Sequence, residues 1–161
     1  MNLYITAYER SNSEKLALLK EATDLGVRWS REEISWANFE PNSKGDFNWK
    51  DFDPWIDELR KRNIGIIGTI QTTPSWASGV SQDVADWYWY VPREPQDFAD
   101  FAYEAARYYA GKIDVWEIWN EPDVDITFRC NKCDAPRVYA EMLNASYAAI
   151  KRANPRATVL I

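Results

Sequence analysis

The chain contains 161 residues, and its 25 acidic side chains outnumber 19 basic ones, which gives a net charge of −6. An acidic chain binds phosphate poorly, so nucleic acid is not an expected partner. The sequence contains no histidine, which excludes Ser-His-Asp and Cys-His triads and His-ligated zinc. Carboxylates are therefore the first candidates for proton transfer near neutral pH.

The sequence contains no stretch of the roughly 18 apolar residues that a membrane span needs. Residues 1–10 lack the basic segment and the apolar segment of a signal peptide. The two cysteines, Cys130 and Cys133, form a single C-x-x-C, whereas zinc-ribbon sites need a second pair or added histidines. We therefore expect no metal site, and the pair is either a local disulfide or two free thiols.

Strand-like runs and helical patterns alternate along the chain. Leu16, Leu19 and Ala22 form an apolar stripe that Gly26 terminates. Ser13 is the expected N-cap of that helix. The predicted strands cover 3–8, 27–35, 64–71, 113–120 and 159–161. The predicted helices cover 14–25, 53–63, 95–110 and 136–153, and the last three begin with Pro54, Pro95 and Pro136 near their first positions.

This alternation predicts an α/β fold in which crossover helices connect parallel strands. We find no linker or low-complexity segment, so residues 1–161 are expected to form one domain. A doubly wound open sheet and a (β/α)₈ barrel both fit this order of elements. The Gly-x-Gly-x-x-Gly loop of dinucleotide-binding folds is absent, which disfavours a doubly wound nucleotide-binding fold. A (β/α)₈ TIM barrel takes about 250 residues. The chain would therefore supply about strands 1–5, the N-terminal part of an incomplete barrel.

Aromatic residues make up 15% of the chain and include 9 tryptophans. Core packing can use some of them, and exposed aromatic rings can bind the flat apolar faces of sugar rings. Trp76, which follows the third predicted strand, and the run 87–90 are candidates for either role.

The predicted strand over 113–120 leads into the most informative segment. Side chains alternate along a strand, so Glu117 and Glu121 are expected to point the same way. Glu121 would lie at the carboxyl end of the strand, where parallel barrels place their active sites. Glu117 would lie deeper, and a buried carboxylate needs a partner. Arg31, on the predicted strand over 27–35, is the natural candidate.

Residues 116–123, Trp-Glu-Ile-Trp-Asn-Glu-Pro-Asp, resemble the Asn-Glu-Pro signature on the fourth barrel strand of the retaining glycoside hydrolases of clan A. Residues 31–41 resemble the second-strand region of the same clan, and residues 72–77 resemble the segment after its third strand. Three motifs in barrel order make this resemblance more specific than the tripeptide alone. The chain most resembles glycoside hydrolase family 39, with families 5 and 42 as neighbours.

The resemblance implies that Glu121 is the general acid/base, that Asn120 binds the sugar 2-hydroxyl and that Arg31 orients the catalytic carboxylates. Shielding by Trp119 and nearby aromatic rings would raise the pKa of the Glu121 carboxyl toward its working range. Trp119 is also expected to contact substrate. No metal or organic cofactor is implied.

Four other residues complete the expected site. Glu117 would have an orienting role through its ion pair. Glu33 shares the parity of Arg31 and is expected to face the pocket as a supporting charge. Gln71 is a candidate polar contact, and Trp76 is a candidate stacking platform. The nucleophile of the clan is a Glu on the seventh strand, and that strand is absent from this chain.

Two functions follow from these observations. The first is a retaining glycoside hydrolase that cleaves a β-linked oligo- or polysaccharide, inactive without the C-terminal half of the barrel. That half would come from the same gene product or from a second chain. The second is a non-catalytic carbohydrate-binding protein or degenerate half-barrel that self-associates through its open strand edges. The localisation is left open, although the substrate class favours secretion or the cell envelope.

Overall fold

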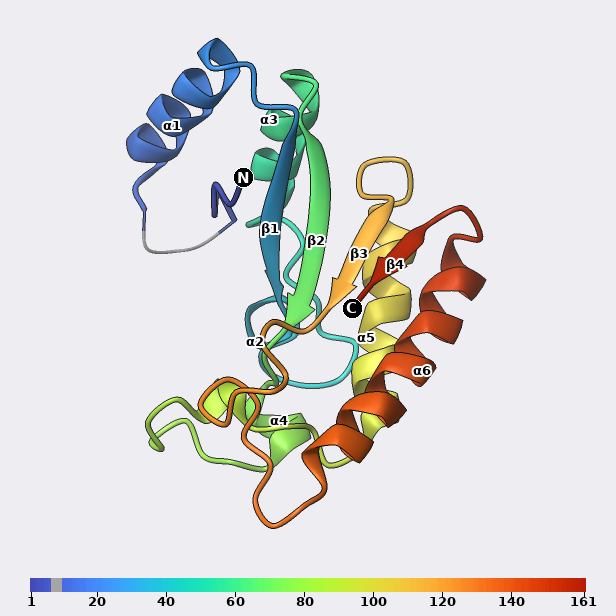
Figure 1. The fold of residues 1–161 in the computed structure, drawn as a ribbon. Helices are drawn as coiled ribbons and strands as arrows, with labels where there is room; N and C mark the ends of the chain where they lie inside the picture. Colours follow the sequence, from blue (N-terminus) through green and yellow to red (C-terminus); the bar gives the residue numbers. More distant parts are fainter. Residues whose placement is uncertain (7–9) are drawn as a thin grey trace.

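The computed structural model describes residues 1–6 and 10–161. Within these residues, four parallel strands form one sheet in the order β1-β2-β3-β4 (Figure 1). The strands are β1 (Trp29–Ser35), β2 (Gly65–Gln71), β3 (Val115–Ile118) and β4 (Thr158–Leu160). The helices are α1 (Asn12–Asp24), α2 (Trp36–Phe39), α3 (Asp53–Lys61), α4 (Ser75–Ser78), the 3₁₀ turn η1 (Trp87–Trp89), α5 (Pro95–Tyr108) and α6 (Ala135–Ala153).

Successive strands run in the same direction because a helix returns the chain between them. Figure 1 shows the four arrows pointing toward one end of the sheet, where α2, α4 and the loop after β3 gather. The predicted α/β pattern is therefore confirmed from β1 onward. Among the described helices, none is long and apolar enough to cross a membrane.

The two faces of the sheet differ in chemistry. One face carries Ile34, Ile70 and Ile118, which are fully buried against the helices and belong to the hydrophobic core. On the other face the strand register aligns Glu33 of β1 with Thr69 of β2, and Thr69 with Glu117 of β3. Because residues in register on parallel strands point to the same face, polar groups from three strands lie in one row.

The strand predicted over 3–8 is not formed in the part that the structure describes. Tyr4 has a φ of 52°, which an extended strand does not allow. Beside β1, the Glu32 carboxylate accepts from the Thr6 amide at 3.2 Å, where a ladder would use backbone carbonyls. Residues 7 and 8 of the prediction lie outside the described residues. The described sheet thus has four strands rather than the expected five.

Helix α1 begins earlier than predicted. Its N-cap is Ser11, not Ser13, because the Ser11 hydroxyl accepts from the Glu14 amide while the Glu14 carboxylate accepts from the Ser11 amide. This reciprocal pair satisfies donors that the first turn would leave open. The other three long helices begin within a residue of their predicted starts, each with proline in the first turn.

Candidate active site

The backbone turns sharply after β3. Trp119 and Glu121 have positive φ values of 68° and 51°, so the strand ends at Ile118 rather than at Asn120. The Trp119 amide still donates to the Ile70 carbonyl of β2 at 2.8 Å. Side-chain alternation therefore stops at Ile118, and the predicted common direction of Glu117 and Glu121 does not follow from strand geometry.

A cluster of polar side chains lies on the open face of the sheet. Arg31 donates from Nε to Glu117 at 2.5 Å and from Nη2 to the Asn120 side-chain oxygen at 2.9 Å. The Thr69 hydroxyl donates to the same Glu117 oxygen at 2.9 Å. The predicted pairing of Arg31 with Glu117 is thus confirmed, and the structure adds Thr69 and Asn120 to it.

Glu121 directly follows Asn120, a member of this cluster. The hydrogen bond to Glu117 raises the pKa of the Arg31 guanidinium above its usual range, and the charge of Glu121 adds to the effect. The Glu121 side chain is exposed, while its carbonyl accepts from the Thr127 hydroxyl at 2.8 Å. The backbone of this residue is therefore held in place, and its carboxyl group is open to a ligand.

Trp119 lies in the hydrophobic core. Its side chain is 1% exposed, and the indole donates to the Thr127 carbonyl at 2.8 Å. The ring packs edge-on against Phe128 and lies near Phe98. In this structure the ring is enclosed by other aromatic side chains, so the predicted role of Trp119 in substrate contact stays a prediction.

Two other predicted residues follow the same strand: Gln71 ends β2, and Trp76 lies in α4. Trp76 is half-buried; its indole donates to the Glu40 carbonyl at 2.9 Å, and its ring meets Trp36 edge-on. Gln71, the last residue of β2, is 7% exposed, and its side-chain oxygen has no hydrogen-bond partner among the described residues. Among the described residues, neither of them hydrogen-bonds to the Arg31 cluster, so their roles stay predictions.

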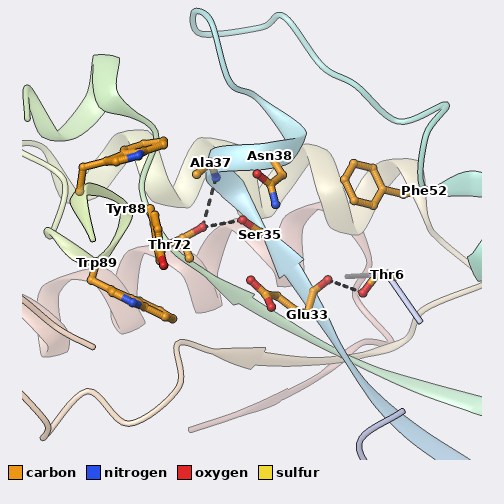
Figure 2. A pocket seen from close by; sticks show the side chains of 10 residues that line it. Thr6, Glu33, Ser35, Ala37, Asn38, Phe52, Thr72, Tyr88 and Trp89 are labelled. Atoms are coloured by element: carbon orange, nitrogen blue, oxygen red, sulfur yellow. Dashed lines mark hydrogen bonds between the residues drawn. The ribbon is translucent and has the colours of Figure 1, made fainter. Parts of the chain in front are cut away.

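A pocket of about 270 Å³ opens beside β1. Figure 2 shows Tyr88 and Trp89 on one side and Phe52 and Thr6 on the other, with the Glu33 carboxyl group between them. Glu33 lines this pocket, which contains none of the Arg31 cluster residues, so its predicted supporting role in the active site stays a prediction. The pocket is lined by Thr6, Glu33, Ser35, Ala37, Asn38, Phe52, Thr72, Trp87, Tyr88 and Trp89.

Most of this lining was not predicted. Thr72, with a φ of 63°, shares a hydrogen bond with the Ser35 hydroxyl at 2.8 Å and accepts from the Ala37 amide at 3.2 Å (Figure 2). This arrangement joins the end of β1 to the end of β2. In the sequence only Glu33 and the aromatic run at 87–90 were candidates, because the other lining residues come from the N-terminal segment, the end of β1, α2, the start of α3 and the segment after β2.

Cys130 and Cys133 form a disulfide, which resolves the two alternatives left open by the sequence. Their Cα atoms are 5.4 Å apart, within the usual range for such a bond. The disulfide lies on the loop that joins β3 to α6. Within the described part of the chain, no group of three or more candidate ligand side chains is placed to hold a metal ion.

No family model matches the chain. Beta-glucosidase 3 of rice, Oryza sativa subsp. japonica, is 30% identical over 111 residues, which cover 66% of this chain and 21% of that protein. The chain spans about a fifth to a quarter of the length of the curated relatives it matches.

Solved structures show a closer likeness in fold. A monomeric beta-xylosidase from Caulobacter crescentus CB15 superposes with a TM-score of 0.70 and 21% identity, covering 92% of this chain and 32% of that one. A family 39 glycoside hydrolase from Bacteroides cellulosilyticus WH2 gives 0.68 and 19%, covering 88% and 27%. The chain has the fold of the N-terminal part of the TIM-barrel glycosidases, and the predicted resemblance to clan A, family 39 included, is confirmed as a likeness of fold.

Proposed function

We propose that this chain carries the acid/base half of a retaining glycoside hydrolase that cleaves a β-linked oligo- or polysaccharide. One observation carries the proposal: Glu121, whose side chain is exposed, directly follows Asn120 of the Arg31–Glu117–Asn120 cluster at the carboxyl end of a parallel sheet. Active sites of (β/α)₈ barrels lie at that end. The glycosidase relationship of the fold supports the reaction class.

In the proposed reaction, Glu121 gives its proton to the glycosidic oxygen as the bond from that oxygen to the anomeric carbon breaks. A second carboxylate forms a covalent bond to the anomeric carbon, and the first product leaves as an alcohol. Glu121, now ionised, takes a proton from water, and the resulting hydroxide displaces the enzyme carboxylate. The two proton transfers restore Glu121 to its starting state.

Asn120 has a defined orientation for this task. Arg31 has only donors, so the oxygen of the Asn120 amide must face it, as their 2.9 Å hydrogen bond indicates. The amide nitrogen then points away from Arg31 with its two protons. Asn120 is therefore set to donate to a sugar hydroxyl, in agreement with the role that the resemblance implies.

The second carboxylate of the proposal comes from outside these 161 residues. Glu117 already accepts from Arg31 and Thr69 through one oxygen, and these donors lower its nucleophilicity by holding charge on that oxygen. A retaining enzyme needs its two carboxyl groups about 5–5.5 Å apart. We propose that the remaining strands of the barrel, from the same gene product or a second chain, supply the nucleophile without a cofactor.

The test replaces Glu121 with Gln in the longest natural polypeptide that contains these residues. Hydrolysis of an aryl β-glycoside with a poor leaving group should fall by about 10²–10⁴-fold. A dinitrophenyl glycoside, whose leaving group needs no proton, should lose far less in its first step. Asp123→Asn, an exposed carboxylate on the same loop, is the matched control.

Equal losses of Glu121→Gln activity on both substrates would contradict the acid/base role. Near-normal activity of this variant on the substrate with the poor leaving group would also contradict it. Sugar binding by the wild type with no hydrolysis of either substrate would instead favour a non-catalytic carbohydrate-binding protein. Both readouts are needed, because binding alone does not separate an enzyme from a lectin-like protein.

A further inference from the structure

We propose that the disulfide between Cys130 and Cys133 is a reversible redox site, and that its reduction by a dithiol releases the loop after β3 from the segment around η1. This inference goes beyond the proposed function and does not depend on it. The disulfide closes a short loop, because the two cysteines are three positions apart in the sequence. Cys133 lies two residues before Ala135, the first residue of α6.

The disulfide is accessible to a reductant. Cys133 is exposed and Cys130 is half-buried, and both line a cavity of about 430 Å³ together with Tyr90, Ile126 and Arg129. Exchange begins when a thiolate attacks one of the two sulfur atoms, so access to that atom limits the rate, and exposed disulfides are among the labile ones. The exposed sulfur of Cys133 is therefore the expected point of attack.

The proposed reaction is a two-electron exchange with a dithiol, such as a protein of the thioredoxin type. One thiolate of the dithiol forms a bond to the sulfur of Cys133, the bond between the two protein sulfurs breaks, and Cys130 leaves as a thiolate. The second thiolate of the dithiol then attacks its partner sulfur in the mixed disulfide and releases Cys133. The dithiol ends as a disulfide, and the two protein thiolates take up the two protons that it gave up.

Arg129 connects the loop after β3 to the segment around η1. Its amide donates to the Trp89 carbonyl at 2.9 Å, and its carbonyl accepts from the Val91 amide at 3.1 Å. Its guanidinium donates to the Asp86 carboxylate at 2.9 Å and lies 5.5 Å from the centroid of the Tyr90 ring. Figure 1 shows this loop passing beside the segment between α4 and α5. We call this set of contacts the Arg129 junction.

The disulfide holds the Arg129 junction close to the start of α6. Cys130 directly follows Arg129, and the disulfide joins it to Cys133. Between the two cysteines, Lys132 has a φ of 56°, which is a left-handed conformation that lysine rarely adopts. When the disulfide opens, Lys132 can leave this conformation and the loop between the cysteines gains freedom. Arg129 then loses its short connection to α6, so the junction opens more often.

The same loop begins at Glu121. Thr127 lies two residues before Arg129, its hydroxyl donates to the Glu121 carbonyl at 2.8 Å, and its carbonyl accepts from the Trp119 indole at 2.8 Å. Release of the junction is therefore expected to reach the backbone of Glu121. The redox state of the disulfide would then control the order of the loop that follows β3.

The test reduces the natural polypeptide of the Glu121 experiment with dithiothreitol under native conditions and measures amide hydrogen exchange by mass spectrometry. Alkylation of the two freed thiols gives the extent of reduction. Exchange in residues 86–91 and 121–129 should rise by about 10–30-fold, as expected for release of so short a loop. Exchange in the interior of α5 should stay unchanged, and reoxidation should restore the starting rates.

Two variants test the connection between the disulfide and the junction. The double variant Cys130→Ser with Cys133→Ser should show the fast exchange with or without dithiothreitol. Arg129→Gln removes the contacts with Asp86 and Tyr90 but keeps the disulfide, so it should open the junction in the oxidised protein. Reduction of this variant should then add little, because both changes act on the same contacts.

Three results would overturn the proposal. The first is a disulfide that resists dithiothreitol in the folded protein, and the second is unchanged exchange at the junction after reduction. The third is an equal rise of exchange in α5, which would show that the disulfide stabilises the whole fold rather than this loop. Since no substrate enters these measurements, loss of the acid/base assignment of Glu121 would not affect the redox inference.

Discussion

Arg31 and Glu117 form a hydrogen-bonded ion pair that reaches across the intervening strand β2. Their Nε and Oε2 atoms are 2.5 Å apart, and the side chains are 22% and 19% exposed. The strand order β1-β2-β3 places β2 between them, and Thr69 of β2 donates to the same carboxylate oxygen. One oxygen of Glu117 thus links three strands on the face that carries the candidate site.

This arrangement predicts a measurable coupling energy. Arg31→Met and Glu117→Gln should each lower the free energy of unfolding by about 1–3 kcal/mol, because each leaves a partly buried partner without its hydrogen bond. The double variant should lose about 1–2 kcal/mol less than the sum of the two. Urea unfolding of the wild type, the two single variants and the double variant gives this double-mutant cycle.

The exposed pair of Lys20 with Asp24, with side chains 76% and 62% exposed, supplies the control cycle. Its coupling should be undetectable, since solvent screens such pairs. Additive losses at Arg31 and Glu117 would show that the ion pair contributes no cooperative stability to the site.

The buried Glu32 predicts a pH dependence of stability. Glu32 is 0% exposed, with the Ser30 hydroxyl and the Thr6 amide as donors, and burial raises the pKa of its carboxyl above the ordinary value. The folded chain therefore binds this proton at a higher pH than the unfolded chain does. The stability that protonation of Glu32 contributes is fully present below the unfolded-state pKa of about 4.3. It is lost as pH rises through the folded-state pKa.

Glu32→Gln removes this titration. The stability of the wild type relative to the variant should fall as pH rises from 4 toward 8, as measured by urea unfolding at each pH. Glu141→Gln, at an exposed position of α6, should show no such slope. A wild-type advantage that grows with pH would mean that the donors around Glu32 outweigh the cost of its burial.

Because Trp119 is buried, we expect its substitution to lower the stability of the fold rather than the affinity for sugar. Trp119→Phe removes the hydrogen bond to the Thr127 carbonyl and leaves space beside Phe128, at a cost of about 2–3 kcal/mol. Trp29→Phe, at a half-exposed ring, should stay within about 0.5 kcal/mol. Thermal and urea unfolding measure both changes. Unchanged stability with weakened oligosaccharide binding would support the substrate-contact role.

Two glycines of β2 should respond differently to substitution. A Cβ on Gly68 would lie 2.9 Å from the ring of Trp116, which is fully buried. A Cβ on Gly65 would meet Trp29 at 2.6 Å, but that ring is half-exposed and can move aside. Gly68→Ala should therefore cost about 1–3 kcal/mol and Gly65→Ala less, in urea unfolding. The opposite order would mean that the core around Trp116 is loosely packed.

Local patterns were sufficient for much of the fold. Proline in the first turn marked α3, α5 and α6, because its fixed φ suits a helix start and its missing donor costs nothing there. The glycine-containing apolar run of β2 was identified within one residue. The N-cap of α1 was misplaced because Ser11 and Ser13 are equivalent in type, and only the reciprocal bond with Glu14 distinguishes them.

The sequence by itself determined the alternation of strands and helices from β1 onward and the placement of Arg31 and Glu33 on one face of β1, since these depend on periodicity among neighbouring residues. The tertiary structure decided that Trp119 turns into the core and that Glu33 meets η1 in a pocket. The reason is that a positive φ at Trp119 and the pocket walls depend on hydrogen bonds and ring contacts with other strands and loops. Residues distant in the sequence supply those contacts, so no local pattern encodes them.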